Sequence, residues 1–262
     1  MSHSWNTDFL TSFSPDRILI ILNQPFSFQL LRSVWNASKW HYCADGGANR
    51  LYDLLSASQN AESLLEVYRP NLVKGDLDSL RDDVKTFYSS NAVPIIRDED
   101  QYSTDLMKCI AAVKEMEQTE GREFEIIILG GLAGRLDQTI HTLSYLHKLR
   151  KERRRVYAVT DDNVGWVLDE GEHAITIDHS MLGLTCGLLP VGIDETILTT
   201  RGLRWNLTNN PSSFDGLVST SNHLVPEEDT VYVKTTKPIW WTAELRPLKP
   251  CSEPVKLNGK ML

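Results

Sequence analysis

Continuous isoleucine-rich runs alternate with helix-type patterns in the first part of the chain, and this alternation constrains the fold most strongly. Residues 17–22 (RILIIL) and 124–129 (FEIIIL) are apolar without interruption over the length of one strand, as is typical of strands buried on both faces of a parallel sheet. Weaker runs of the same kind occupy residues 72–73, 93–96 and 156–160. Residues 104–118 and 137–149 instead place their apolar residues on one helical face. We therefore predict an α/β layer with a mainly parallel sheet.

The pattern changes after residue 169 to short β-prone runs separated by turn residues. These runs cover residues 174–177, 187–191, 196–199, 217–219, 230–235 and 239–245. Their spacing is typical of a β-sandwich or barrel. We predict an α/β domain over residues 1–169, in which residues 1–15 form a loose tail. An all-β sandwich domain is expected over residues 170–262, with residues 248–262 as a second tail.

Composition and charge exclude several classes of protein. The chain has 27 Lys and Arg against 35 Asp and Glu, which disfavours a nucleic-acid partner bound through phosphate attraction. Its four cysteines form no CxxC pair and no signal-like start is visible, so they are expected to be reduced thiols of a cytoplasmic protein. The apolar runs are too short to cross a bilayer, so no membrane association is expected.

Carboxylates follow the predicted strands in four loops. They are Asp45 in CADGGANR, Asp76 and Asp78 in KGDLDS, Asp105 in DQYSTD and Asp137 in GGLAGRLDQ. Turn formation or a helix N-terminus can account for single members of this set, whereas Asp76 and Asp78 repel each other unless a cation binds them. Because ligands of open α/β sheets bind at the carboxyl ends of strands, the loops together predict a site for Mg²⁺ carrying a polyphosphate.

Glycines in two of these loops fit the same ligand. The pairs 46–47 and 130–131 permit close backbone approach, and amides at the following helix N-termini can bind phosphate oxygens. Arg135 either donates to phosphate or pairs with a neighbouring Asp. The Walker-type loop, the GxGxxG fingerprint and the kinase and hydrolase motifs do not occur.

Two segments of the β region combine an aromatic with small polar residues. They are residues 204–208 (RWNLT) and 219–222 (STSN). A Trp face suits a flat or cationic aromatic ligand, although a lone Trp in a β domain is usually a core residue. Of the adjacent pair Trp240 and Trp241, we expect at least one in the core.

With these motifs the sequence resembles the thiamine pyrophosphokinase family, eukaryotic type. The matching blocks are CADGGANRLYDLL, GDLDS, residues 100–109, GGLAGRLDQ, CGLLPVG, GLRWNLTN and LVSTSN. The resemblance implies that a homodimer transfers the pyrophosphoryl group of ATP to the hydroxyl of thiamine and releases AMP, with Mg²⁺ required. It places ATP and Mg²⁺ on the α/β domain and thiamine on the β domain, across the subunit interface.

The resemblance also implies roles for individual residues. The carboxylates that it expects to bind metal or orient the phosphates are Asp45, Asp76, Asp78, Asp105 and Asp137. Of these, the expected metal ligands are Asp76, Asp78 and Asp105. Contacts with ATP fall to Gly46, Gly47, Asn49, Arg135 and Gln138. Contacts with thiamine fall to Gln101, Trp205, Ser219, Ser221 and Asn222, with Trp205 stacking on a ring. Bacterial relatives often carry His at the position of Gln138, and animal-like members carry Asp and His at Tyr102 and Ser103.

Two other functions are compatible with parts of the sequence. A metal-dependent nucleotide-sugar transferase also uses a D-x-D motif after a strand, but it leaves the glycine loops and the β region unexplained. A nucleotide- or thiamine-binding regulatory protein without turnover is the non-enzymatic alternative. All five candidate carboxylates are present, which favours an enzyme.

Overall fold

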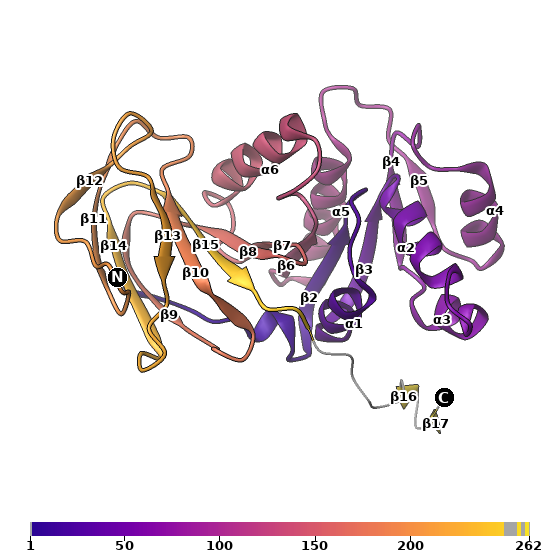
Figure 1. Ribbon diagram of the computed structural model, residues 1–262. Coiled ribbons are helices and arrows are strands. Elements are labelled where there is room, and N and C mark those ends of the chain that lie inside the picture. The colour runs from indigo at the N-terminus through magenta and orange to yellow at the C-terminus, as the bar shows by residue number, and fades with distance from the viewer. Residues whose placement is uncertain (1, 249–255, 258–259, 262) are drawn as a thin grey trace. The chain divides into compact units, whose positions relative to one another are not determined.

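The chain folds into two compact units (Figure 1). The computed structural model describes residues 2–248, 256–257 and 260–261. The parallel unit contains residues 12–130, and the β unit contains residues 2–11 and 131–247. Among the described residues, no helix has both the length and the apolar character needed to cross a membrane.

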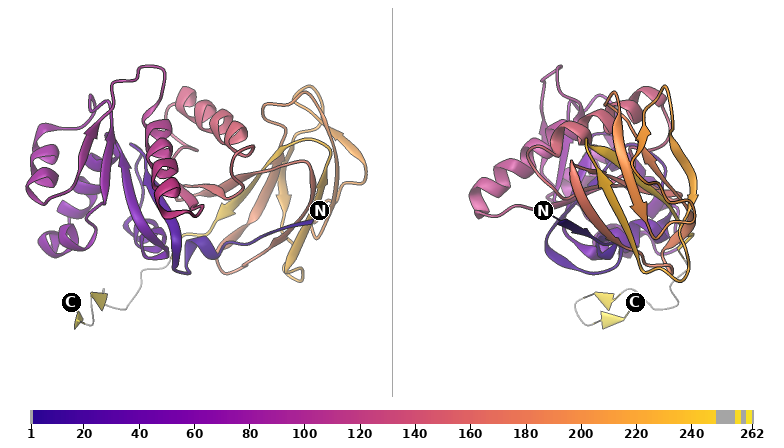
Figure 2. Two further views of the ribbon diagram at one scale, coloured as in Figure 1. Left: turned by 180° about the vertical axis from the view of Figure 1, so that it is seen from behind. Right: turned by 90° about the vertical axis from the view of Figure 1, so that its left-hand side faces the viewer.

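The parallel unit is a five-stranded sheet in the order β6-β2-β3-β4-β5, with every neighbouring pair parallel. Its elements are β2 (Ser14–Ile21), α1 (Phe28–Ala37), β3 (Ser38–Ala44), α2 (Gly47–Ser56), α3 (Ala61–Val67), β4 (Leu72–Gly75), α4 (Asp82–Ser90), β5 (Ile95–Arg97), α5 (Asp105–Glu120) and β6 (Glu125–Leu129). Strands β2 and β6 pair Ile20 with Ile128, and both residues are fully buried. Helices α1 and α2 lie in front of the sheet in Figure 1, whereas α5 lies in front in the reverse view of Figure 2. The isoleucine runs are apolar throughout because helices cover both faces of this sheet.

The β unit consists of two sets of strands and one helix. Its elements are β1 (Ser2–Trp5), the 3₁₀ turn η1 (Asp8–Leu10), α6 (Leu136–Leu149), β7 (Val156–Val159), β8 (Asn163–Leu168), β9 (Gly171–Thr176), β10 (Leu182–Leu189), β11 (Thr196–Arg201), β12 (Asn210–Ser212), β13 (Ser219–His223), β14 (Thr230–Thr235) and β15 (Ile239–Leu245). One set has the order β13-β10-β15-β8-β7 and is antiparallel, and the other has the order β1-β9-β14-β11-β12.

Aromatic side chains form the core of the β unit. Trp5 of β1 stacks on Trp166 of β8, with ring centroids 5.8 Å apart, and so joins the two sets of strands. Trp240 and Trp241 are both buried, although neighbouring residues of a strand point to opposite faces. Both faces of β15 are therefore covered, which confirms the expected core Trp.

The predicted fold class is confirmed, but the compact units divide the chain at a different residue from the predicted domains. The break falls between residues 130 and 131, because β8 pairs with β15 from Asn163 to Leu168 and β7 pairs with β8. These pairings attach residues 156–168 to the β strands. The predicted division into an α/β domain and an all-β domain at residue 169 stays a prediction.

The expectation that residues 1–15 form a loose tail is wrong. Strand β1 pairs in parallel with β9, and the indole Nε1 of Trp5 donates to Nδ1 of His173 at 3.0 Å. Phe9 is 1% exposed and stacks on Tyr157 with ring centroids 3.9 Å apart. Two aromatic anchors in a polar, aperiodic segment therefore hold it against the β unit. The predicted tail 248–262 lies outside the described residues, apart from Leu248 and the short pair β16 (Lys256–Leu257) and β17 (Lys260–Met261).

We expect Phe9→Ala to lower the free energy of unfolding by about 3–5 kcal/mol, because it removes a buried ring and leaves a cavity against Tyr157. Phe13→Ala is the matched control, since Phe13 is 62% exposed, and its effect should stay within about 0.5 kcal/mol. Urea denaturation followed by intrinsic fluorescence measures both. Equal effects of the two variants would contradict the anchoring role of Phe9.

Candidate active site

Three of the predicted acids converge at the carboxyl edge of the parallel sheet. Asp45 follows β3, and Asp76 and Asp78 follow β4. One carboxylate oxygen from each lies within 4.8 Å of the other two. Strands β3 and β4 are parallel neighbours, so their carboxyl ends meet at one edge and bring these loops together.

Backbone groups hold the acids in place. The amide of Asp76 donates to Oδ1 of Asp105 at 3.2 Å, which attaches the first residue of α5 to the group. The amide of Ser79 donates to Oδ2 of Asp45 at 3.0 Å, and the amide of Asp78 donates to Oδ1 of Asp76 at 3.1 Å. The acid group, defined as Asp45, Asp76, Asp78 and Asp105, is therefore preorganised by its own loops.

Gly75 permits the close approach of two of these acids. A Cβ at this position would lie 2.7 Å from Cβ of Asp45 and 2.8 Å from Oδ1 of Asp105. Both distances are well inside van der Waals contact, so any side chain here would push the acids apart. The GDLDS motif thus needs its glycine for packing.

Burial and mutual repulsion disfavour the charged forms of Asp45 and Asp105. Asp45 is 1% exposed, and burial, together with the charges of Asp105, Asp76 and Asp78, raises its pKa to about 6, although the Ser79 amide partly offsets the rise. Burial is also the main cause that raises the pKa of Asp105. Oδ1 of Asp45 is buried and finds no hydrogen-bond donor among the described residues. A buried carboxylate oxygen without a donor, beside two further carboxylates, fits a hard divalent cation such as Mg²⁺.

Lys108, which the sequence reasoning did not select, lies beside these acids. It follows Asp105 by one helical turn on α5, and its side chain is 1% exposed. Its Nζ lies 3.8 Å from Oδ1 of Asp105 and 4.0 Å from Oδ2 of Asp76. The i, i+3 spacing from Asp105 was the signal that could have found it.

The predicted ATP residues of the parallel unit lie next to the acid group. Gly46 and Gly47 connect Asp45 to α2, and a Cβ on Gly47 would lie 2.2 Å from the carbonyl oxygen of Ile21. The side-chain amide of Asn49 already forms two hydrogen bonds. Its Nδ2 donates to the Ser79 carbonyl at 2.7 Å, and its Oδ1 accepts from the backbone amide of Arg81 at 3.1 Å. Asn49 therefore positions the loop after β4.

Three further predicted residues lie in the β unit, at the start of α6. Arg135 forms a bidentate pair with Asp137, with N–O distances of 3.1 and 2.6 Å. The hydrogen bonds from Arg135 lower the pKa of Asp137. This matches the structural alternative considered for Arg135, and the adjacent Gln138 is exposed. Asp137 belongs to a different compact unit from the acid group.

Trp205 presents an aromatic face on the loop between β11 and β12. Its side chain is 51% exposed, the guanidinium carbon of Arg204 lies 4.8 Å from its ring, and the His223 ring lies 4.8 Å away. Asn222 holds this loop, because its Oδ1 accepts from the Trp205 amide at 3.2 Å and its Nδ2 donates to the Trp205 carbonyl at 2.9 Å. The side-chain amide of Asn222 is thus hydrogen-bonded to the backbone of Trp205.

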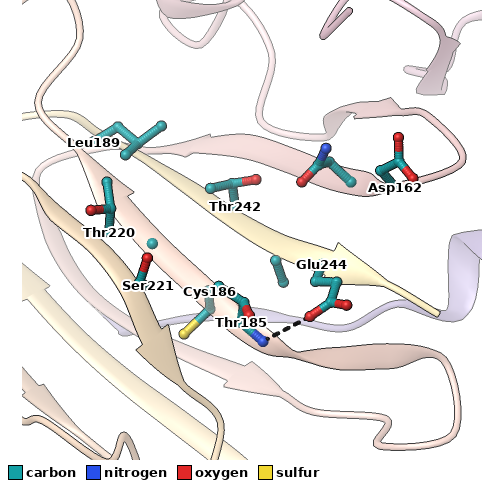
Figure 3. Close-up of a pocket in the computed structure, with 11 residues that line it drawn as sticks. Asp162, Thr185, Cys186, Leu189, Thr220, Ser221, Thr242 and Glu244 are labelled. Atoms are coloured by element: carbon teal, nitrogen blue, oxygen red, sulfur yellow. Dashed lines mark hydrogen bonds between the residues drawn. The ribbon is translucent and has the colours of Figure 1, made fainter.

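Ser221 lines an open pocket of about 320 Å³ on the face of β13, β10 and β15 (Figure 3). Thr242 lies on the same face, and Glu244 accepts from the Thr185 amide at 3.1 Å at one end of the pocket. Of the other predicted thiamine residues, Ser219 is buried on β13. Gln101 is exposed in the parallel unit, where its Nε2 donates to the Glu99 carbonyl at 3.3 Å.

Comparison with known proteins agrees with this architecture. Residues 31–158 match the family model of the thiamin pyrophosphokinase catalytic domain, and residues 172–240 match that of the thiamin pyrophosphokinase vitamin B1 binding domain. Thiamine pyrophosphokinase 3 of Oryza sativa subsp. japonica is 36% identical over 87% of this chain and 86% of its own. Thiamine pyrophosphokinase of Saccharomyces cerevisiae is 32% identical over 79% of each chain.

Solved structures show the same fold over nearly the whole chain. The crystal structure of yeast thiamin pyrophosphokinase superposes with a TM-score of 0.83 at 28% identity, covering 93% of this chain and 91% of that one. Thiamin pyrophosphokinase from Candida albicans gives a TM-score of 0.81 at 26% identity, covering 94% and 93%. Fold and site together define a two-domain enzyme with an acidic site on a parallel sheet. The chain belongs to the thiamine pyrophosphokinase family, which confirms the resemblance seen in its motifs.

We expect Asp45→Asn to stabilise the protein near neutral pH in the presence of EDTA, by about 1–3 kcal/mol. The carboxyl binds its proton more tightly in the folded state, with a pKa of about 6. Ionisation therefore costs the native state, and wild-type stability should fall relative to the variant as the pH rises from about 4 to about 6. Urea denaturation across this range measures the difference.

The control for this experiment is Asp82→Asn, because Asp82 is exposed at the start of α4. It should change stability by less than about 0.5 kcal/mol at each pH. A constant gap between wild type and Asp45→Asn at every pH would show that the carboxyl of Asp45 is not perturbed.

Proposed function

We propose that this chain transfers the pyrophosphoryl group of ATP to the hydroxyl of thiamine, giving thiamine diphosphate and AMP. The observation that carries the proposal is the convergence of Asp45, Asp76 and Asp78 at the carboxyl edge of the parallel sheet, in a chain that belongs to the thiamine pyrophosphokinase family. Such an edge is where open α/β sheets bind ligands, and converging carboxylates suit a metal that accompanies a polyphosphate.

The acid group divides into metal ligands and a proton acceptor. Asp76, Asp78 and the buried Oδ1 of Asp45 would hold Mg²⁺, which when bound neutralises phosphate charge and orients the chain of phosphates. Asp105 was expected to be a third metal ligand, but its Oδ1 already accepts the Asp76 amide. We propose that its Oδ2 accepts the proton of the thiamine hydroxyl, since burial raises the pKa of this carboxyl and makes it a stronger base. Pyrophosphoryl transfer needs positioning and charge neutralisation more than a covalent intermediate.

The remaining predicted residues would bind the two substrates. The backbone amides of Gly46 and Gly47 would bind phosphate oxygens at the start of α2, and Arg135 with Gln138 would contact ATP after exchange of the Arg135–Asp137 pair. In the β unit, the exposed ring of Trp205 would stack on a thiamine ring. Ser221 offers its hydroxyl at the nearby pocket, and Asn222 keeps the Trp205 backbone in place.

The two alternatives are less well supported. Family membership across both units does not favour a nucleotide-sugar transferase. A regulatory protein that binds ATP and thiamine without turnover would retain the fold, and a turnover measurement separates it from an enzyme.

Wild-type protein should release AMP from ATP and Mg²⁺ only when thiamine is present. Asp78→Asn should lower kcat by about 10²–10³-fold, because one charged contact to the phosphate-bearing metal is lost. Asp82→Asn, an exposed acid four residues further on, is the matched control and should retain wild-type turnover. Coupled detection of AMP and ADP measures the reaction.

Each other outcome of this assay has a definite meaning. Release of ADP, or of AMP without thiamine, would contradict the proposed bond cleavage or acceptor. Binding of both substrates without turnover would favour the regulatory protein.

We also propose that the chain acts as a homodimer whose active site combines residues of two copies. The family resemblance supports a shared site. In a C₂ dimer, each active site would take its acid group from one protomer and its Trp205 from the other. Light scattering measures the mass of the assembly.

Co-expression of two inactive variants tests the shared site. When Asp78→Asn and Trp205→Ala chains are made in equal amounts, half of the dimers carry one intact site, so roughly a quarter of wild-type activity should return. A site formed within one chain would give no recovery. Co-expression of Asp78→Asn with Asp105→Asn is the control, since both acids belong to one unit and no intact site can form.

The cysteines support a cytoplasmic location, which we also propose. Cys43, Cys109 and Cys186 are buried thiols without a disulfide, and burial raises the pKa of each, that of Cys186 to about 12. Such inert, reduced thiols suit a reducing compartment.

A further inference from the structure

Lys108 is a buried cation whose ammonium points at the acid group. Side chains of a helix lean toward its N-terminus, so Lys108 reaches back over the first turn of α5 toward Asp105. Its side chain is 1% exposed, and Nζ lies 3.8 Å from Oδ1 of Asp105 and 4.0 Å from Oδ2 of Asp76. The ammonium therefore lies near one oxygen of each of two carboxylates.

These two contacts are ionic but not hydrogen-bonded. Within the part of the chain that the structure describes, Nζ of Lys108 has no hydrogen-bond partner, although an ammonium carries three donors. Placing such a group in the interior is costly unless nearby charge compensates it. The acid group is the nearby compensation, since it brings four carboxylates together.

The second buried lysine of this edge is arranged differently. Lys74 on β4 is 8% exposed, and its Nζ pairs at 3.7 Å with Asp98, after β5. Its charge is thus matched by one acid of its own. Lys108 instead lies beside Asp76, a proposed metal ligand, and Asp105, the proposed base.

We propose that Lys108 is a resident counter-cation of the acid group, which holds Asp76 and Asp105 in place while no metal is bound and weakens the binding of a free divalent ion. This inference rests on the metal site of the proposed function. A divalent ion alone would meet an ammonium close to two of the carboxylates, whereas an ion that arrives with a polyphosphate brings negative charge of its own. Lys108 is therefore a positioning residue that favours the metal–nucleotide complex over the free metal.

The test measures the affinity of the apo protein for MnCl₂ alone, by titration calorimetry without ATP or thiamine. Lys108→Met keeps the length of the side chain and removes its charge, so it should bind Mn²⁺ about tenfold more tightly than wild type. In EDTA, its melting temperature should fall below that of wild type, and Mn²⁺ should restore it. Lys74→Met is the matched control, and its Mn²⁺ affinity should stay within about threefold of wild type.

The results that overturn the inference are equally definite. Mn²⁺ affinity of Lys108→Met that is unchanged, or weaker than wild type, would show that Lys108 only fills space or supports the acids sterically. If Lys108→Met does not fold in EDTA or in Mn²⁺, Lys108→Gln replaces it, because the Gln amide is uncharged and keeps polar N–H groups at this buried position. The same criteria then apply.

The titration is independent of the proposed reaction. If wild-type protein releases no AMP but Lys108→Met binds Mn²⁺ more tightly, the proposed function fails and the role of Lys108 stands. If AMP is released but the Mn²⁺ affinity does not change, the proposed function stands and the counter-cation is excluded.

Discussion

Repulsion among four carboxylates at one sheet edge is the constraint on which the rest of the parallel unit depends. Asp45, Asp76 and Asp78 place oxygens within 4.8 Å of one another, and Asp105 is hydrogen-bonded to the Asp76 backbone. Like charges this close destabilise a fold unless a cation or a proton offsets them. Burial, together with this repulsion, raises the pKa of Asp45 to about 6. Because the empty site is destabilised by this repulsion, binding of a cation stabilises the protein, and this favours binding of a metal together with a polyphosphate.

The scaffold contains this repulsion with rigid local structure. The parallel strands β3 and β4 hold the two acidic loops in register, and amides of Asp76, Asp78 and Ser79 each donate to a carboxylate. The amides that donate to Asp45 and Asp105 favour the charged forms of these two acids. Gly75 lets Asp45 and Asp105 approach, since any Cβ there would contact both. Local hydrogen bonds therefore offset part of the repulsion among the acids. The helices on both faces of the sheet supply the buried core that supports the loops.

The periodic parts of the sequence predicted the fold well, and the non-periodic parts did not. The isoleucine runs are β2 and β6, because uninterrupted apolar residues are stable only when both faces are covered. The strand expected at residues 217–219 begins instead at Ser219, since the Leu217 carbonyl accepts from Ser212 and Ser213 in a turn. Lys108 was not selected from the sequence, because its burial on α5 depends on tertiary packing. The convergence of Asp45 with Asp76 and Asp78 could be anticipated from strand ends, whereas the burial of Asp45 required tertiary packing.

The Trp205 loop meets a different physical requirement from the acid group. Its backbone is fixed by the amide of Asn222, which pairs with both the N–H and the carbonyl of Trp205, so the loop loses little entropy when a ligand binds. The ring itself stays exposed, and the Arg204 guanidinium lies 4.8 Å from it. Thiamine carries a cationic thiazolium ring and would compete with Arg204 for the same aromatic face. A flat cation that stacks there exchanges one cation–π contact for another, so its net affinity must come largely from burial of ring area. Tight positioning of a neutral aromatic face therefore favours selection by shape over selection by charge.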